Sequence, residues 1–439
     1  MLSDGPEQIS LDETLARMLS MVDPFVGIIR SSELQPSRHD DARLFLVVTL
    51  LSEISGLGVQ ANVTYGAGVH YELNQATICS IGESLERYCS SFEDARREVS
   101  SSARELGERA MDLADFAPFT DQQYRSRDFP YIRVTKDTQL RWARASGPRG
   151  EERFVPVQAV YMSHQPREVR LAPKTSSGLA LHSDPTKAKL SGLLELVERD
   201  AFMIAWHNSL RMPRIDHSGH ALATKLYERY YAPAGLRTIA LDLSAFSGVP
   251  TVMTYAIDDS GEGPRYSFGA ASGLTLFSAW EKALREAYHT VSYGRRILEI
   301  ANAKVYDNDY SDIHTFEEHL MLYARHDTVL NTQFFEDSGL HVDLGATGDA
   351  VVVDGLSGLC RLLEDQGVEM CFAETTTEDV AIEGFSVFRA VAPRLVPLDS
   401  SHIHRQQGKR RLTHRAYEVG LLPNPLTVDQ LSTAPHPFP

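Results

Sequence analysis

The sequence predicts an α+β fold built as one large domain, because long helical patterns alternate with short strand-like runs and no linker separates them. Apolar residues recur at helical spacing over residues 11–22, 40–55, 72–111, 186–208, 276–299 and 314–325. Runs rich in β-branched and aromatic residues, which are typical of strands, are RFVPVQAVYM, LRTIALDL, VPTVMTYAID, AVVVDG and GFSVFRAVAP. Since no Pro-, Gly- or Ser-rich stretch exceeds the length of a loop, we expect a single domain over all 439 residues.

Composition and charge exclude several classes of protein. The net charge is −16, and such an acidic surface repels phosphate backbones, so nucleic acid is not an expected partner. The longest apolar stretch, Leu44 to Leu51, is far shorter than the roughly 20 residues of a membrane span, so no membrane association is expected. Four cysteines without CxxC spacing argue against zinc and disulfides, and the acidic N-terminus is no signal peptide, which together predict the reducing cytoplasm.

Two copies of Glu-x-x-Glu-Arg stand inside helical patterns, one at Glu83, Glu86 and Arg87, the other at Glu195, Glu198 and Arg199. Residues three apart lie on one face of a helix, so the two glutamates of each copy project together. The repetition of this motif suggests two equivalent helices that face a shared site.

Four converging carboxylates repel one another unless cations lie among them, and hard oxygen ligands of this kind suit magnesium that bridges phosphates. The following arginines could clamp phosphate oxygens or the carboxylates themselves. Exposed helices also carry this motif as ordinary ion pairs, but both copies lie in apolar surroundings, where unneutralised carboxylates are costly. No P-loop, dinucleotide fingerprint or kinase motif is present, so the residues alone predict a metal and phosphate site without a named reaction.

The stretch TSSGLALHSDPTKAKLSGLLELVERDAFMIAW, from Thr175 to Trp206, resembles the central motif of the YcaO family. YGAGVHYELNQATICSIGESLERY (Tyr65 to Tyr88) and AWEKALREAYHTVSYGRR (Ala279 to Arg296) resemble two further motifs of that family in the same order. GFSVFRAVAPRLVPL resembles its late strand and loop. The resemblance covers most of the chain and implies a YcaO-type domain with mixed sheets and helices around a central ATP and Mg²⁺ site.

The resemblance also implies roles for single residues. The predicted Mg²⁺ ligands are Glu83, Glu86, Glu195 and Glu198, and the predicted ATP contacts are Arg199, Lys282, Glu286, Ser183 and Arg87. The chain departs from the family pattern at Ala67, Ser177, His182, Lys187 and His289. These departures either reflect variation within the family or a weakened nucleotide site, and Lys187, at a frequent glutamate position, is the most consequential.

The sequence ends in Pro435-His436-Pro437-Phe438-Pro439, within the proline-rich tail of the domain over 424–439, and residues 1–22 are its N-terminal extension. Taken alone, such a tail is typically disordered or a polyproline ligand. Azoline-forming YcaO proteins resemble this chain in ending with such a motif, which implies that the tail enters the active site. The predicted catalytic residues are therefore Pro439, through its carboxylate, with Pro437 and Pro435, and His289 as a second candidate base.

The function that the resemblance implies is that of an ATP-dependent cyclodehydratase subunit, which converts Cys, Ser or Thr residues of a ribosomally made precursor peptide to thiazolines or oxazolines. The implied partners are the precursor peptide and a separate leader-binding protein related to ubiquitin-activating enzymes, since no such domain is expected before Asp23. A flavin-dependent dehydrogenase that oxidises the rings is a third partner that such systems do not always have. Thioamide or macroamidine formation and a non-catalytic scaffold role are the alternatives.

Overall fold

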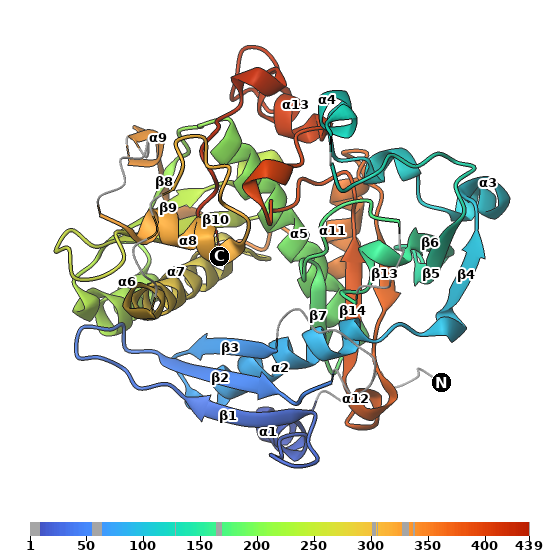
Figure 1. The fold of residues 1–439 in the computed structure, drawn as a ribbon. Helices are drawn as coiled ribbons and strands as arrows, with labels where there is room; N and C mark the ends of the chain where they lie inside the picture. Colours follow the sequence, from blue (N-terminus) through green and yellow to red (C-terminus); the bar gives the residue numbers. More distant parts are fainter. Residues whose placement is uncertain are drawn as a thin grey trace.

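The structure, a computed structural model, describes residues 9–54, 64–127, 129–163, 169–300, 304, 306–326, 333–336 and 339–438. Three sheets and several helices surround the long helix α5 (Pro185–His207), which lies near the middle of the molecule (Figure 1). The predicted α+β fold class is confirmed.

The N-terminal sheet is antiparallel, in the order β1 (Ile29–Leu34), β2 (Phe45–Leu51) and β3 (Tyr65–His70). Helix α2 (Leu73–Ser91) packs on β2 and β3, and α1 (Leu11–Ser20) packs on α2. Apolar side chains of these elements, including Met18, Ile81 and Leu85, form one buried cluster. Residues 11–20 therefore belong to the packed body of the domain.

The second sheet carries the main core. Its order is β11 (Tyr266–Ser272), β10 (Thr251–Ile257), β9 (Arg237–Asp242), β8 (Arg214–Asp216) and β12 (His341–Asp343), all antiparallel except for the parallel pair of β8 and β12. Helix α7 (Leu276–Ile300) packs on β10 and β11 and also reaches β3, so it joins this sheet to the N-terminal one.

The third sheet lies on the other side of α5 (Figure 1). Its order is β4 (Glu98–Ser101), β5 (Leu140–Ser146), β13 (Cys371–Glu374), β14 (Ser386–Val391) and β7 (Leu179–His182), with β6 (Glu152–Pro156) paired to β5. The remaining helices are α3 (Ala103–Leu106), α4 (Asp121–Arg125), α6 (Ala221–Leu226), α8 (Phe316–Ala324), α9 (Gln333–Glu336), α10 (Leu344–Thr347), α11 (Gly355–Glu364), α12 (Glu378–Ile382) and α13 (Arg410–Glu418).

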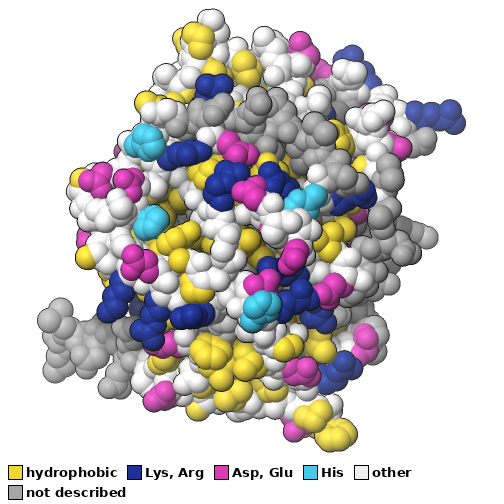
Figure 2. All heavy atoms as spheres, turned by 90° about the vertical axis from the view of Figure 1, so that its left-hand side faces the viewer, with side chains coloured by type: hydrophobic (Ala, Val, Ile, Leu, Met, Phe, Trp, Pro, Cys, Tyr) yellow, Lys and Arg dark blue, Asp and Glu magenta, His cyan; other side chains and the backbone are white. Residues whose placement is uncertain are grey.

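Figure 2 shows one face of the molecule, on which acidic and basic side chains are interspersed. Hydrophobic side chains gather at its lower end, the end where Figure 1 places β1 to β3. Among the residues that the structure describes, none of the helices is both long and apolar enough to cross a membrane.

Two predicted helices were wrong in part or in full. Residues 45–51 of the 40–55 stretch form strand β2, because the short apolar run FLVVTLL fits either element by periodicity and pairs with strands on both sides. The helix predicted over 72–111 ends at Ser91, and a turn and β4 follow it. At this end the hydroxyls of Ser90 and Ser91 bond to the carbonyl of Arg87, the local competition by which serine disfavours further helix.

The strand predictions were better. LRTIALDL, VPTVMTYAID and GFSVFRAVAP contain β9, β10 and β14, whereas RFVPVQAVYM is a strand only as far as Pro156. AVVVDG is not a strand. Val351 and Val352 are exposed and lie in the loop before α11, where no neighbouring strand offers the packing on which β-propensity depends. The helices predicted at 11–22, 186–208, 276–299 and 314–325 correspond to α1, α5, α7 and α8.

Helix α5 is anchored by a buried ion pair. Its start is set by Pro185 in the first turn and by the Asp184 side chain, which caps the Thr186 N–H. Further along, the fully buried Asp200 lies 2.5 Å from Nη2 of Arg411 on α13 and also accepts the Val396 N–H at 2.9 Å. The carboxylate thus ties α5 to α13 and to the loop after β14.

We expect Arg411→Met to lower the free energy of unfolding by about 3–5 kcal/mol, because it leaves the Asp200 carboxylate buried without its cation. Urea unfolding would measure this loss. The matched control is Arg410→Met, since the neighbouring Arg410 side chain is 70% exposed and its ion pair with Glu418 lies near the surface. An equal effect of both substitutions would contradict the anchoring role of Asp200.

Candidate functional site

Helix α2 approaches strand β3 unusually closely because β3 carries two glycines. A Cβ atom added to Gly66 would lie 2.6 Å from the Ser80 carbonyl oxygen, and one added to Gly68 would lie 2.2 Å from that of Ala76. Only glycine fits at such distances. The approach brings the N–H of Ala67, between the two glycines, to 2.7 Å from the Glu83 carboxylate.

Glycines also allow a close backbone approach at α5. A Cβ added to Gly192 would lie 2.3 Å from the carbonyl oxygen of Gly178, which itself has a φ of +87°. The Gly178 N–H donates to the Glu195 carboxylate at 3.0 Å. Both copies of the sequence motif therefore hold their first glutamate with a backbone N–H from a glycine-containing segment.

Each following arginine turns back to that first glutamate. Arg87 lies 2.6 Å from Glu83, and Arg199 lies 3.4 Å from Glu195. Of the two roles left open for these arginines, the structure has both in contact with carboxylates. The two helices thus carry equivalent local arrangements, as the repetition of the motif in the sequence suggests.

The second glutamate of each copy is less well compensated. Glu86 accepts the Leu181 N–H at 2.8 Å, yet desolvation raises its pKa to about 8. Glu198 is 1% exposed and lies 2.7 Å from Arg199, but its Oε1 has no aligned hydrogen bond, and desolvation with nearby carboxylates raises its pKa. We call Glu83, Glu86, Glu195 and Glu198 the carboxylate cluster.

Helix α7 adds charged groups to this cluster. Lys282 lies 3.7 Å from Glu286, and both interact electrostatically with Glu198. His289 faces Glu83 and Glu286, and desolvation lowers its pKa, so the imidazole is neutral at pH 7 and able to accept a proton. Ser183 lies in the turn between β7 and α5, where its hydroxyl is 3.5 Å from Nδ1 of His182.

The cluster has the properties of a cation site that a positive charge would complete. Across the described ranges, no three His, Cys, Asp or Glu side chains are already placed to hold one metal ion. However, the raised pKa values of Glu86 and Glu198 indicate that burial and neighbouring carboxylates outweigh the compensation that the protein's own residues give. A hard divalent cation fits this donor set of carboxylate oxygens.

In the C-terminal segment, residues 431–438, the last four residues 435–438 are buried, and Leu431 and Phe438 belong to the apolar core that α5 and α8 share. Three consecutive carbonyls, those of Ala434, Pro435 and His436, accept hydrogen bonds from Trp206, Tyr323 and His319 at 3.2, 2.6 and 2.7 Å. Because prolines offer no N–H, recognition through carbonyls suits this sequence.

The same segment reaches the carboxylate cluster. The Phe438 ring is buried and lies under the Arg199 guanidinium, 4.4 Å from its carbon, and packs on Phe202. The contact is a cation–π pair with the arginine that pairs with Glu195 and Glu198. Pro435 and Pro437 lie in this buried stretch, whereas Pro439 is outside the described residues.

Sequence reasoning missed Arg389, a buried arginine on β14 beside this site. Its Nη1 atom has no hydrogen-bond partner, and burial lowers its pKa to about 10. Arg389 and Arg199 both line a cavity of about 150 Å³. The signal was present in GFSVFRAVAP, where one arginine interrupts an apolar strand.

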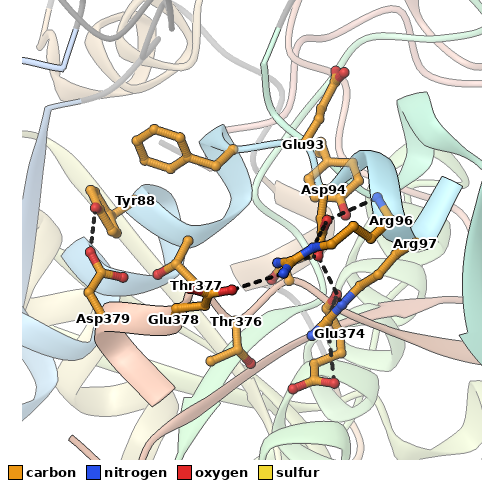
Figure 3. A pocket seen from close by; sticks show the side chains of 13 residues that line it. Tyr88, Glu93, Asp94, Arg96, Arg97, Glu374, Thr376, Thr377, Glu378 and Asp379 are labelled. Atoms are coloured by element: carbon orange, nitrogen blue, oxygen red, sulfur yellow. Dashed lines mark hydrogen bonds and ion pairs between the residues drawn. The ribbon is translucent and has the colours of Figure 1, made fainter. Parts of the chain in front are cut away.

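A larger cavity, of about 530 Å³, lies at the other end of α2 (Figure 3). Its charged groups already pair with one another: Arg96 with Asp94 and Glu378, Arg97 with Glu374, and Asp379 with Tyr88. Both arginines of this lining are therefore engaged with carboxylates, and the lining as a whole is acidic, with five carboxylates and two arginines.

The centre of this mixed α+β fold gathers undercompensated carboxylates beside buried arginines, the groups that suit metal cations and phosphate oxygens. A model of the YcaO cyclodehydratase family, described as binding ATP and Mg²⁺, matches residues 66–396. The chain belongs to the YcaO family, and ATP and Mg²⁺ are its cofactors.

Solved structures with a similar fold include heterocyclases. A heterocyclase in complex with substrate and cofactor has a TM-score of 0.77 and 20% identity over 99% of this chain and 58% of its own. The heterocyclase TruD has a TM-score of 0.64 and 21% identity over 82% of this chain and 50% of its own. YcaO from Methanopyrus kandleri, bound to AMPPCP and Mg²⁺, has a TM-score of 0.59 and 16% identity over 88% of this chain and 91% of its own.

Two curated relatives are uncharacterized proteins. One, from Methanothermobacter thermautotrophicus, is 26% identical over 59% of this chain and 66% of its own length. The other, a protein of the tfuA 3' region of Rhizobium leguminosarum bv. trifolii, is 33% identical over 24% of this chain and 26% of its own length. The chain therefore spans less than two thirds of either relative.

We expect Glu198→Gln to flatten the pH dependence of stability in the absence of Mg²⁺ and ATP. Burial raises the pKa of Glu198 from 4.5 to about 8, so its contribution to stability is complete below about pH 4.5 and is lost as the pH rises through 8. The wild-type free energy of unfolding should fall between pH 5 and pH 8.5, and the substitution should make this fall about 2–4 kcal/mol smaller, since one pKa unit corresponds to about 1.4 kcal/mol.

Urea unfolding at several pH values would measure this difference. Glu228→Gln, at an exposed position on another helix, is the control and should keep the wild-type slope. A wild-type slope in Glu198→Gln would contradict the assignment of uncompensated charge to Glu198.

Proposed function

We propose that this protein is an azoline-forming cyclodehydratase subunit. It would convert Cys, Ser or Thr residues of a ribosomally made precursor peptide to thiazolines or oxazolines, with one molecule of water lost per ring and ATP consumed. Membership of the YcaO family and the similarity to heterocyclase structures support an ATP-dependent enzyme, and the peptide chemistry is the proposal.

The observation that carries the proposal is the position of the C-terminal segment. A proline-rich end with no role in the chemistry would have no need to lie buried beneath Arg199, yet Phe438 and the carbonyls of residues 434–436 are fixed there by aromatic and histidine side chains. An end positioned at the cluster is what the azoline-forming members of the family are expected to have.

In this reaction the substrate side chain attacks the preceding backbone carbonyl, whose oxygen then has to depart. ATP with Mg²⁺, when bound, supplies the phosphoryl group that makes this oxygen a leaving group. The carboxylate cluster would hold the cation, and Arg199 and Lys282 would neutralise phosphate charge. Arg87, Ser183 and Glu286 are the further proposed ATP contacts.

A base has to remove the proton of the attacking side chain and that of the ring nitrogen. His289 is one candidate, because desolvation lowers its pKa and leaves the ring neutral beside Glu83. The Pro439 carboxylate is the other, since Pro437 and Phe438 bring the chain to the site. Pro435 and Pro437 would act by stiffening the approach.

The proposed partners follow from the same function. The chain spans 58% and 50% of the two heterocyclase chains it resembles, and the E. coli microcin synthetase McbBCD is a complex whose structure has also been solved with pro-MccB17 bound. We propose that a separate protein related to ubiquitin-activating enzymes binds the leader of the precursor. A flavin-dependent dehydrogenase would act later, where rings are oxidised. All four cysteines are free thiols, which suits a cytoplasmic location.

We expect the precursor peptide, incubated with this protein, its partner, Mg²⁺ and ATP, to lose the mass of one water per ring, with matching release of phosphate. Phe438→Ala should lower the rate at least about tenfold, because it removes the ring that orients Arg199. Mass spectrometry and a phosphate assay measure both quantities.

Pro425→Ala is the matched control, because Pro425 belongs to the same proline-rich stretch but is exposed. Wild-type activity in Phe438→Ala and in a variant lacking residues 435–439 would contradict the role of the tail. An unmodified peptide despite ATP binding would favour thioamide or macroamidine chemistry. An absence of ATP binding would favour a scaffold, with Lys187 and Ala67 as its explanation.

A further inference from the structure

The cavity of about 150 Å³ beside Arg199 is basic, which we refer to as the arginine cavity. It is lined by segments 171–177 and 389–397 and by parts of α5, with four cationic side chains and one carboxylate: Lys174, Arg199, Arg389, Lys409 and Asp115. The carboxylate is already paired, since Arg394, which is not in the lining, lies 2.8 Å from Asp115. The lining therefore holds more cationic than anionic side chains, and of these cations Arg199 also pairs with Glu195 and Glu198.

Part of this charge has no partner within the described protein. Nη1 of Arg389 is buried without a hydrogen bond, whereas Nη1 of Arg199 lies 2.7 Å from Glu198. Arg389 is 9% exposed and has no carboxylate within ion-pair distance, only a longer-range interaction with Glu195. A buried guanidinium left in this way is costly unless an anion completes it.

The fourth cation supports the same interpretation. The Lys409 ammonium donates to the carbonyls of Asp115 and Pro393, and within the described ranges Lys409 has no ion pair, only a longer-range interaction with the Asp115 carboxylate. Burial lowers the pKa of Lys409 to about 8 and that of Arg389 to about 10, and a bound anion would reverse both shifts. Hydroxyl groups of Thr175 and Ser177 also line the cavity and can donate hydrogen bonds.

The size of the cavity limits the anion. Pockets for nucleotides and other ligands of similar size measure about 300–1,000 Å³, so a volume of about 150 Å³ suits a small anion. A tetrahedral oxyanion matches the fork of a guanidinium, which binds phosphate oxygens in a bidentate manner. The cavity also borders Arg199, which pairs with Glu195 and Glu198 of the carboxylate cluster.

We propose that the arginine cavity binds the inorganic phosphate that the reaction releases, with Arg389 as its principal contact and Arg199 shared between this site and the carboxylate cluster. This inference rests on the proposed function. In the last step, the bond between the former carbonyl carbon and its phosphorylated oxygen breaks, and its electron pair leaves with that oxygen on phosphate. The ring nitrogen gives up its proton as the C=N bond of the azoline forms.

A separate place for phosphate has a chemical benefit. Once the phosphate has moved against Arg389, it is withdrawn from the reaction centre while ADP is still bound. Phosphate should therefore bind to the complex of the protein with ADP and Mg²⁺, and should inhibit the reaction as a product.

The test is isothermal titration calorimetry of inorganic phosphate into the full chain saturated with ADP and Mg²⁺. We expect Arg389→Met to weaken phosphate binding at least tenfold and to change the affinity for ADP by less than twofold. Arg389→Lys, which keeps the charge but loses the fork, should fall between the two. Arg361→Met, an exposed arginine on α11 outside the lining, should match the wild type.

Other outcomes would overturn the inference. Unchanged phosphate affinity in folded Arg389→Met would remove Arg389 from the site, and an equal loss of ADP affinity would instead assign Arg389 to the nucleotide. Phosphate should compete with AMPPCP but not with ADP, because the inferred phosphate site and the γ-phosphate position would hold the same phosphoryl group one after the other. Competition with ADP would therefore contradict the inference. If azolines form but phosphate binding does not depend on Arg389, only this inference is contradicted. If phosphate binding depends on Arg389 but no azoline forms, only the proposed function is contradicted.

Discussion

The burial of carboxylates is the constraint around which the centre of this molecule is built. Desolvation raises the pKa of Glu86 on α2 and of Glu198 on α5, and neighbouring carboxylates add to both shifts. The compensation is partial and local, through backbone N–H groups and one arginine on each helix. The negative charge that remains uncompensated is what a bound divalent cation would neutralise.

The energy for holding the cluster together comes from elsewhere in the fold. Gly66, Gly68, Gly178 and Gly192 allow backbone segments to pack directly on the two helices. The buried contacts of the C-terminal segment and the large apolar core around α5 add packing energy on the far side. A site that destabilises the apo protein is thus carried by a scaffold with ample burial, the usual relation between function and stability.

The sequence predicted the chemistry of the centre better than its surroundings. Period and spacing indicated the faces of α2 and α5, because a helix converts an i, i+3 spacing directly into proximity. The position of the C-terminal segment at the site was predicted from the resemblance to the family, not from the pattern of its own residues. The contacts of Arg389, Asp200 and Tyr323 could not be predicted, since each depends on residues more than 100 positions away that only the folded chain brings near. The errors at 40–55 and 350–355 have the opposite cause: short apolar runs take their structure from whichever neighbours they meet.

Residues 198 to 200 place three charged side chains, of alternating sign, on consecutive positions of α5, and each contacts a different part of the protein. Glu198 faces the cluster, Arg199 contacts Phe438, and Asp200 binds Arg411. An α-helix turns by about 100° per residue, so a single inserted or deleted residue before position 198 would rotate all three away from their partners at once. Relatives with this centre should consequently vary in the length of their loops but keep α5 free of insertions and deletions between the turn at Gly178 and Asp200.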